Sequence, residues 1–341
     1  MMQRTFFFLF VLAMALGSSA QDNDTIPSKS SRKARTALDE NKPYRALKLC
    51  NKAVGRKVPD RACYALRAEA LNRTGDPRAA IADARIGLAH EQSIPLAYLQ
   101  MGIGYHAIGM RDSAEWAYRR ALESKFAIEA RYRLALLERE TDRTAEALAD
   151  LMQVTSAEPT VAKYIRERGV THAMLGDSAA ARADLDKAIE LEPENPVNWN
   201  TRGFQRYASF GEHERAIKDY ERAIKLDANH GYAFNNRGWS RYKLGNVEAG
   251  LRDIRLAGRK NPSNAMVDRN LGVIAIDQGK TQLACTLWRT ALDKDFTARF
   301  GNEVKTLVEQ HCGKTTSGAP LDIQDRNAPK PTPAPQRGNA P

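Results

Sequence analysis

Small residues recur at fixed intervals through residues 27–295, with a period of about 34 positions. The clearest marker is a pair of small residues seven positions apart, in which Val154 is the one larger member. The pairs are Ala46/Ala53, Ala80/Gly87, Ala114/Ala121, Ala147/Val154, Ala181/Ala188, Ala216/Ala223, Gly250/Ala257 and Ala284/Ala291. Another small residue precedes each pair by twelve positions, or by thirteen in one copy, at Ala34, Ala68, Gly102, Ala135, Gly169, Gly203, Gly238 and Gly272. Seven residues make about two helical turns, so each pair lies on one helix face.

This pattern predicts a pair of antiparallel helices in each copy, packed closely at the small residues. A large side chain at such a contact would overpack, typically at a cost of about 1–3 kcal/mol. Turn residues separate the two helices of most copies, at Gly75, Gly109, Gly176, Gly211, Gly245 and Gly279. Prolines close several copies at Pro159, Pro193 and Pro262. The copy that contains Gly203 has one extra residue between Gly203 and Ala216, which we expect in the turn after Tyr207.

These residues resemble the tetratricopeptide repeat, a 34-residue pattern with an aromatic residue, Leu-Gly, Ala, a second aromatic, Ala and Pro. The best copies read VNWNTRGFQRYASFGEHERAIKDYERAIKLDAN and YAFNNRGWSRYKLGNVEAGLRDIRLAGRKNP. The resemblance covers about four fifths of the chain and implies an all-α solenoid, a right-handed superhelix of about eight repeats with a concave face. The implied repeats are 27–60, 61–94, 95–127, 128–161, 162–195, 196–230, 231–264 and 265–295. Ala34, Ala68 and Ala135 stand where the family has Gly, and the first repeat has Ser30 where several others have an aromatic residue.

Two charged positions of the repeat change together. Where an Arg precedes the small residue of the first helix, an Asp follows the first small residue of the second helix by three positions. The predicted pairs are Arg67–Asp83, Arg168–Asp184, Arg202–Asp219 and Arg237–Asp253. Where the first position is apolar, at Met101 or Leu271, the second is Ala117 or Leu287. Because a lone buried charge is costly, the covariation indicates a structural ion pair within each repeat rather than Arg side chains that bind a partner.

Two repeats depart from this rule. Asp150 stands opposite Leu134, so we expect Arg133 to substitute as its partner. Lys33 stands opposite Leu49, and in a terminal repeat we expect that Lys to stay in solvent.

The first twenty residues predict a cleaved secretory signal peptide. Arg4 supplies a positive charge, Phe6 to Leu16 form an apolar run, and small residues precede Gln21. An uncleaved anchor is the alternative, but a spanning helix needs about 20 apolar residues. We therefore expect signal residues 1–20, a linker over 21–26, no transmembrane segment after cleavage, and a periplasmic or extracellular protein.

The other end predicts a disordered tail over residues 313–341. It contains six of the fifteen prolines and few residues that could be buried. Alternating Pro removes backbone donors and favours an extended, solvated chain.

Four cysteines allow two local disulfides in an exported protein. Cys285 lies on the last predicted repeat, and Cys312 ends a capping helix predicted from Thr297 to His311, within segment 296–312. A bond between them would fasten that helix over the open end of the solenoid. Cys50 and Cys63 lie on adjacent helices and could pair in the same way. Four buried free thiols are the alternative.

Charge and chemistry narrow the possible functions. The net charge is +11, or +10 once Arg4 leaves with the signal peptide, which favours acidic partners or anionic surfaces. The six histidines are scattered, and no metal-ligand, nucleophile-elbow or phosphate-loop motif is present. The sequence therefore predicts no enzyme, no cofactor, no metal site and no small-molecule substrate, and it does not favour a nucleic-acid partner.

The family resemblance implies that the first helix of each repeat lines the concave face. Carried over position by position, it gives these candidate partner contacts: Leu99, Ile103, His106, Tyr132, Arg166, Asn200, Phe204, Tyr207, Asn235, Trp239 and Tyr242. The sixth and seventh repeats each present an Asn and two aromatic residues at the same spacing. Such residues can bind a peptide, since Asn bonds to backbone groups and aromatics provide contact area. The alternative is that these aromatics pack against the neighbouring repeat.

Two functional hypotheses follow. The first is a secreted or periplasmic scaffold that holds a peptide or helix of another protein in the concave groove. The second is a binder of an anionic polymer or cell-envelope component through the basic surface.

Overall fold

The structure, a computed structural model, describes residues 28–56, 60–90 and 95–313. These residues form helices and short connections, with no strand among them. None of the helices in these ranges is both long and apolar enough to cross a membrane. The predicted signal peptide (1–20), linker (21–26) and residues 314–341 of the predicted tail lie outside the described residues.

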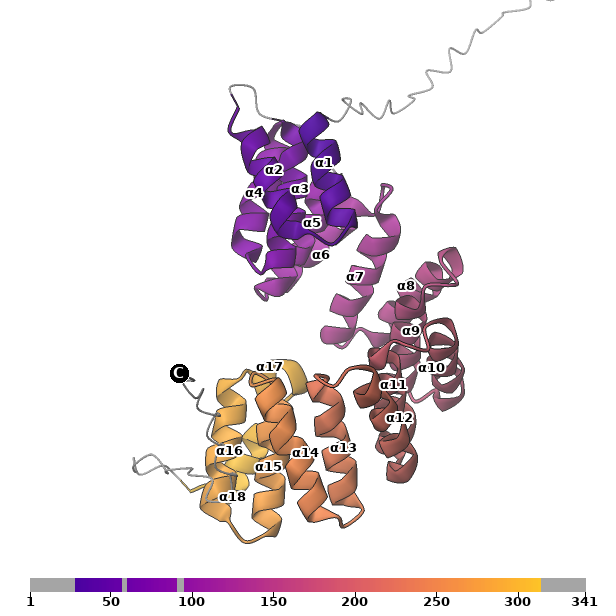
Figure 1. The fold of residues 1–341 in the computed structure, drawn as a ribbon, viewed down its shortest axis with the longest axis vertical. Helices are drawn as coiled ribbons and strands as arrows, with labels where there is room; N and C mark the ends of the chain where they lie inside the picture. The colour runs from indigo at the N-terminus through magenta and orange to yellow at the C-terminus, as the bar shows by residue number, and fades with distance from the viewer. Residues whose placement is uncertain (1–27, 57–59, 91–94, 314–341) are drawn as a thin grey trace, which may run out of the picture. The chain divides into compact units, whose positions relative to one another are not determined.

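The helices fall into two compact units that divide after Ser209 (Figure 1). The first unit contains α1 (Lys29–Asp39), α2 (Pro43–Val54), α3 (Arg61–Thr74), α4 (Pro77–His90), α5 (Pro95–Ala107), α6 (Arg111–Ala121), α7 (Ala127–Glu140), α8 (Thr144–Ala157), α9 (Ala162–Met174), α10 (Ser178–Leu191), α11 (Pro196–Arg202) and η1 (Gly203–Tyr207). The second contains α12 (His213–Leu226), α13 (Gly231–Lys243), α14 (Val247–Lys260), α15 (Ala265–Asp277), α16 (Thr281–Asp293), α17 (Phe296–Phe300) and α18 (Glu303–His311). The short η2 (Ala208–Phe210) spans the division.

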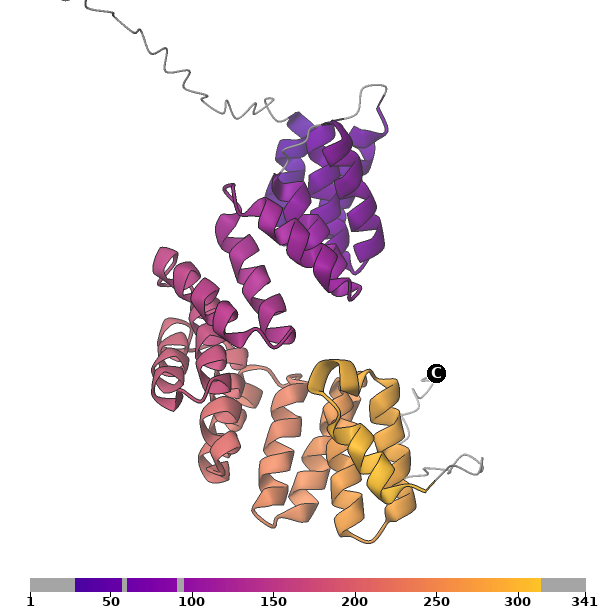
Figure 2. The ribbon, with the colours of Figure 1, turned by 180° about the vertical axis from the view of Figure 1, so that it is seen from behind.

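Within each unit, consecutive helices pack side by side as hairpins, which Figure 2 shows from the opposite side. We call the odd-numbered helices α1 to α15 the first helices, and the even-numbered helices α2 to α16 the second helices. An all-α solenoid of helical hairpins is therefore confirmed.

The small residues of the repeat lie buried between the helices. A Cβ atom on Gly272 would stand 2.3 Å from Nε1 of Trp288. Gly238 and Gly250 face each other so closely that a Cβ on either would lie 2.8 or 2.7 Å from the carbonyl oxygen of the other. Since real Cβ atoms do not approach neighbouring atoms this closely, the helices can meet here only where the side chain is absent.

The turn inside each repeat contains one residue with a left-handed backbone. The eight residues, with their φ angles, are Asn41 (55°), Gly75 (87°), Gly109 (77°), Asp142 (59°), Gly176 (82°), Gly211 (79°), Gly245 (83°) and Gly279 (72°). Gly adopts this conformation without strain, and Asn and Asp are the residues that tolerate it best after Gly. The two copies without a turn Gly therefore make the same turn with Asn41 and Asp142.

The extra residue of the sixth repeat lies within a helix, so its predicted place in the turn is wrong. In the other seven repeats the left-handed residue follows the small residue by seven positions, but Gly211 follows Gly203 by eight. The structure has a π-helical segment, η1, immediately before the turn. A π-turn contains one residue more than an α-helical turn. The extra residue therefore lies in the helical segment that ends at Tyr207, and not in the turn after it.

The C-terminal cap is two short helices rather than the single helix predicted from Thr297 to His311. The helical backbone is interrupted between α17 and α18 at Gly301, whose φ is 83°. Phe296 and Val304 are fully buried against Trp288 and the last repeat, so these two helices cover its open end.

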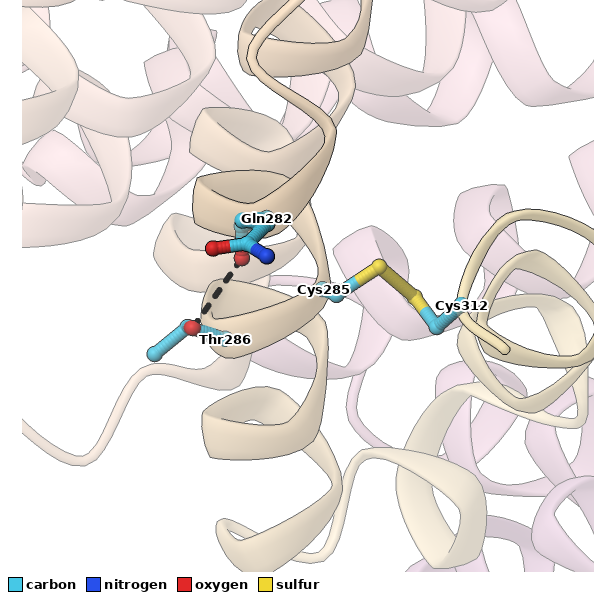
Figure 3. The surroundings of a disulfide bond; sticks show 4 residues. All are labelled: Gln282, Cys285, Thr286 and Cys312. Carbon is cyan, nitrogen blue, oxygen red and sulfur yellow. Dashed lines mark hydrogen bonds between the residues drawn. A yellow bond between two sulfur atoms is a disulfide. The ribbon is translucent and has the colours of Figure 1, made fainter. Parts of the chain in front are cut away.

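A disulfide fixes this cap in place. Cys285 on α16 and Cys312 at the end of α18 are bonded, with Cα atoms 5.7 Å apart and a sequence separation of 27 (Figure 3). The predicted pairing of these two residues is therefore confirmed. In the chain-entropy view, closing a loop of this length stabilises the fold by about 3 kcal/mol.

The second predicted disulfide is not formed. Cys50 on α2 and Cys63 on α3 are both buried and both free thiols. They share a hydrogen bond, and together with burial it raises the pKa of the Cys63 thiol far above its ordinary value. The Sγ of Cys63 also lies 3.5 Å from Oδ2 of Asp60, to which it donates. A thiol with a raised pKa is a poor nucleophile, so Cys63 is not activated for disulfide formation although Cys50 is adjacent.

The close contact at Gly250 gives a direct test of the packing. Gly250→Ala should lower the free energy of unfolding by about 1–3 kcal/mol, because the new methyl group meets the backbone of α13. Gly258→Ala, on the same helix, is the matched control, since its Cβ would meet only the terminal Cγ1 of Val267, at 3.2 Å. Urea unfolding followed by circular dichroism measures both. Equal stability of the two variants would contradict the packing argument.

Candidate functional site

The Arg residues that recur at one position of the repeat form bonds inside the fold. Arg67 donates to both oxygens of Asp83, with Nε–Oδ2 at 2.6 Å and Nη2–Oδ1 at 2.7 Å. The same bidentate hydrogen bonding joins Arg168 to Asp184 (2.8 and 2.7 Å) and Arg237 to Asp253 (2.8 and 2.9 Å). The Asp side chains are at most 10% exposed. These three predicted ion pairs are present, and their geometry is that of structural bridges between the two helices of one repeat.

The fourth predicted pair is not tested. Arg202 lies in the first unit, where its Nη1 donates to Oδ1 of Asp186 at 3.1 Å. Asp219 is buried on α12 in the second unit. A pair between Arg202 and Asp219 therefore stays a prediction.

The substitute predicted for the fourth repeat is wrong. Asp150 accepts from Nη1 of Arg131 at 2.8 Å, whereas Nε of Arg133 donates to Glu129, also at 2.8 Å. Arg131 lies three residues before Leu134 and so shares its helix face, while Arg133 points to a residue one turn away on another face. Lys33 is exposed, as expected for the terminal repeat.

Polar side chains join neighbouring first helices at matching positions. The bonds are Arg35–Glu69 (2.9 Å), His106–Glu140 (2.9 Å), Lys163–Glu129 (3.2 Å) and Asn270–Asn235 (3.1 Å), each between residues 34 or 35 apart in sequence. Arg166, a predicted partner contact, donates through Nη1 to Oδ1 of Asn198 at 2.9 Å. The face formed by the first helices is therefore largely satisfied by bonds within the protein. The sequence did contain this signal, as complementary polar residues one repeat apart.

Three of the predicted partner contacts are buried, so that assignment is wrong for them. Leu99 is 3% exposed and lies in the hydrophobic core of the first unit. Tyr132 is 8% exposed, its ring centroid lies 4.9 Å from that of Tyr164, and burial raises its pKa to about 12. Asn235 is 2% exposed and accepts the bond from Asn270. Each lies at a helix position that faces the next repeat, so packing between repeats is the correct interpretation for these residues.

Two further candidates on α5 are held by neighbouring side chains. Ile103 is partly buried and packs against the core of the first unit. His106 bonds through Nε2 to Glu140, and this hydrogen bond lowers the pKa of that carboxyl group.

Aromatic and charged side chains gather on α13 and α15 of the second unit. We call Trp239, Tyr242, Lys243, Arg269 and Asp277 the Trp239 cluster. The two ring centroids lie 5.3 Å apart, and Cζ of Arg269 lies 4.7 Å from the centroid of Trp239. The Tyr242 hydroxyl donates to Asp277. Both aromatic rings are partly exposed, and Lys243 and Asp277 are exposed.

The candidates of the sixth repeat lie at the end of the first unit. Phe204 is 44% exposed, and Asn200 is partly exposed. The guanidinium of Arg206 lies 5.0 Å from the ring centroid of Tyr207, with that of Arg202 at 6.0 Å. The structure thus leaves Phe204 available for contact and engages Tyr207 with two cations.

A buried acid on α7 was not anticipated. Glu138 is 3% exposed, and its Oε2 has no hydrogen-bond partner within the described residues. Burial, with the charge of Asp150, raises its pKa to about 7. No spacing or motif distinguishes Glu138 from the many surface Glu residues, so the sequence held no usable signal.

The described residues form no group of three or more His, Cys, Asp or Glu side chains that could hold a metal ion. What the first-helix face offers is partly exposed aromatic rings beside cations, a surface suited to contact with another macromolecule.

Comparison with known proteins agrees with this architecture. Two stretches, residues 167–195 and 202–257, match sequence profiles of the family described as tetratricopeptide repeat. The chain therefore contains tetratricopeptide repeats. No curated protein matches its sequence. Tetratricopeptide repeat proteins bind other proteins and are generally non-enzymatic scaffolds.

Solved structures show the same fold. A chain of the APC/C hetero-tetramer Cut9–Hcn1 superposes with a TM-score of 0.61 at 15% identity, covering 84% of this tetratricopeptide repeat chain. Our chain spans only 57% of the length of that one. A tetratricopeptide repeat protein from Parabacteroides merdae gives a TM-score of 0.60 at 18% identity, with 72% of this chain and 96% of that chain covered.

The buried acid of this repeat protein predicts a pH-dependent stability. The folded-state pKa of Glu138, about 7, lies above its ordinary value of 4.5, so the folded state favours the protonated acid. Its contribution to stability is therefore fully present below about pH 4.5 and is lost as the pH rises through about 7. Glu138→Gln should be more stable than the natural protein at pH 8, by about 1–3 kcal/mol, and should match it near pH 5.

Thermal or urea unfolding at both pH values measures this difference. Glu146→Gln, at an exposed position on α8, is the control and should follow the natural protein. A Glu138→Gln variant that keeps the natural difference between pH 5 and pH 8 would contradict the assignment.

Proposed function

We propose that this protein is an exported, non-enzymatic scaffold that holds a peptide or helix of a partner protein against its first-helix face. The Trp239 cluster carries this proposal. It combines two partly exposed aromatic rings with cations on two adjacent repeats of one unit.

The chemistry of the cluster defines a partner segment. Trp239 and Tyr242 offer an apolar surface with fixed orientation, because Arg269 lies over one ring and Asp277 accepts from the other. Such rigid aromatic residues lose little conformational entropy when a partner binds, which makes them effective anchors. Lys243 is exposed beside them and lies 5.9 Å from the Trp239 ring centroid. The segment bound here has an apolar side chain for the rings and an acidic group within reach of Lys243.

The location outside the cytoplasm rests on the sequence of residues 1–20, where a positive charge, an apolar run and small residues follow one another. The confirmed disulfide between Cys285 and Cys312 supports an oxidising compartment.

A paired substitution tests the binding face. Trp239→Ala combined with Tyr242→Ala should reduce recovery of the partner from an envelope extract at least tenfold, because two adjacent anchors are lost. Mass spectrometry of proteins retained by the immobilised chain, from Gln21 onward, gives the measurement. Trp116→Ala is the matched control, since this Trp is 50% exposed on α6, a second helix. The proposal fails if the paired variant retains the same proteins in the same amounts as the natural chain.

Export has its own test. When the full sequence is expressed in a bacterium, the protein recovered from the envelope fraction should begin at Gln21, as read by N-terminal sequencing. Recovery of the protein from the cytoplasm with Met1 or Met2 in place would show that the segment is not a cleaved signal.

A further inference from the structure

The positive charge of the chain is concentrated in its first repeat. Residues 28–56 contain nine cations and two anions, a net charge of +7 out of +11 for all 341 residues. The cations are Lys29, Arg32, Lys33, Arg35, Lys42, Arg45, Lys48, Lys52 and Arg56. All of them except Arg35 are exposed. The remainder of the chain is therefore close to balanced, and α1 with α2 forms a distinct basic end of the first unit (Figure 1).

The two acids of this segment neutralise little of the charge. Glu40 accepts from Lys42 at 2.8 Å and lies 3.8 Å from Arg45, while Asp39 lies 3.6 Å from Arg35. Other cations have no such partner: among the described residues, no ion pair involves Lys29, Lys33, Lys48 or Lys52.

Helix α2 separates its charged side from its buried side. Ala46, Cys50 and Ala53 are fully buried against the neighbouring helices. Lys48 and Lys52 are exposed on the opposite side, one turn apart. Tyr44 stands a further turn before them and is 74% exposed, the highest value among the exposed large hydrophobic residues of the described chain. The outer side of the helix is thus a row of ammonium groups that begins with a protruding phenol ring.

We propose that Tyr44, Lys48 and Lys52 of α2 form, together with Lys29 and Lys33 of α1, a basic face that docks on an anionic lipid surface. Flexible Lys side chains suit a surface of diffuse phosphate charge, and each cation near such a surface strengthens binding about fivefold. A Tyr side chain is favoured at the level of the lipid headgroups, where its hydroxyl group is hydrated and its ring is shielded from water. The five residues chosen for this face include no Arg or Asn, the side chains that most often read the edges of purine bases, and this favours lipid over nucleic acid.

This docking is independent of the Trp239 cluster, which lies in the other compact unit. The basic face would hold the scaffold at a membrane, and the first-helix face of the second unit would hold a partner. Each function can fail without the other.

Vesicle co-sedimentation tests the proposal with the chain from Gln21 to Pro341. The natural protein should sediment with vesicles of phosphatidylcholine that contain 30% phosphatidylglycerol, and it should not sediment with vesicles of pure phosphatidylcholine. It should be released from the anionic vesicles as the salt concentration is raised from 0.05 to 0.5 M, because salt screens the attraction between surface charges. Lys33→Glu with Lys48→Glu and Lys52→Glu should reduce the affinity at least 50-fold. Tyr44→Ala should reduce it several-fold without a change in salt dependence.

A matched triple variant separates the face from net charge. Lys218→Glu with Lys225→Glu and Arg255→Glu makes the same change in charge at exposed positions of the second unit, and it should change the affinity less than threefold. Circular dichroism confirms that both variants are folded. The Trp239→Ala, Tyr242→Ala variant should sediment like the natural protein.

Three outcomes would overturn the proposal. The natural protein could fail to sediment with the anionic vesicles, or the two triple variants could lose the same affinity, which would assign the effect to net charge alone. A 30-base-pair DNA that binds more tightly than the vesicles at equal salt would assign the face to nucleic acid instead.

Discussion

Close approach of helices at positions without side chains is the constraint on which this structure depends. At Gly238 and Gly250, two helices meet backbone to backbone, and at Gly272 the indole of Trp288 occupies the space that a Cβ would need. Once a helix pair has closed in this way, the position of every other residue on its faces is fixed. The ion pairs between helices, the polar bonds between repeats and the exposed clusters all follow from that spacing. The fold therefore tolerates wide variation elsewhere while a few sites admit only the smallest residues.

Sequence could predict what is repeated and local. The Arg–Asp covariation located Arg67–Asp83, Arg168–Asp184 and Arg237–Asp253, because burial in a repeated contact forces both partners to change together. The disulfide at the C-terminal cap could be predicted for a related reason, because the open end of a solenoid needs a covering segment. What sequence could not give was orientation within a helix face. Asn235 has a residue type suited to peptide binding, but a small rotation about the helix axis separates an exposed position from one that faces the next repeat.

Departures from the repeat were the hardest features to predict. The additional residue of the sixth repeat was counted correctly. The count alone does not show whether a helix or a turn contains that residue, and only the backbone reveals the π-turn in η1. Cys50 and Cys63 are adjacent as expected, yet adjacency in space does not decide between two thiols and a bond. Glu138 shows the same limit, because its burial results from the packing of α7 against its neighbours.

The covalent bond between α16 and α18 makes the two ends of the repeat array differ in their resistance to local unfolding. In a linear stack, each end repeat has a single neighbour, so fraying begins at the termini and spreads inward. Joining Cys285 to Cys312 ties the last hairpin to its cover and suppresses fraying from that side. Local opening then begins preferentially at α1 and α2, far along the chain from the tied end. A protein of this design loosens mainly from its amino-terminal hairpin, and its amide protons should be better protected in the carboxyl-terminal hairpins.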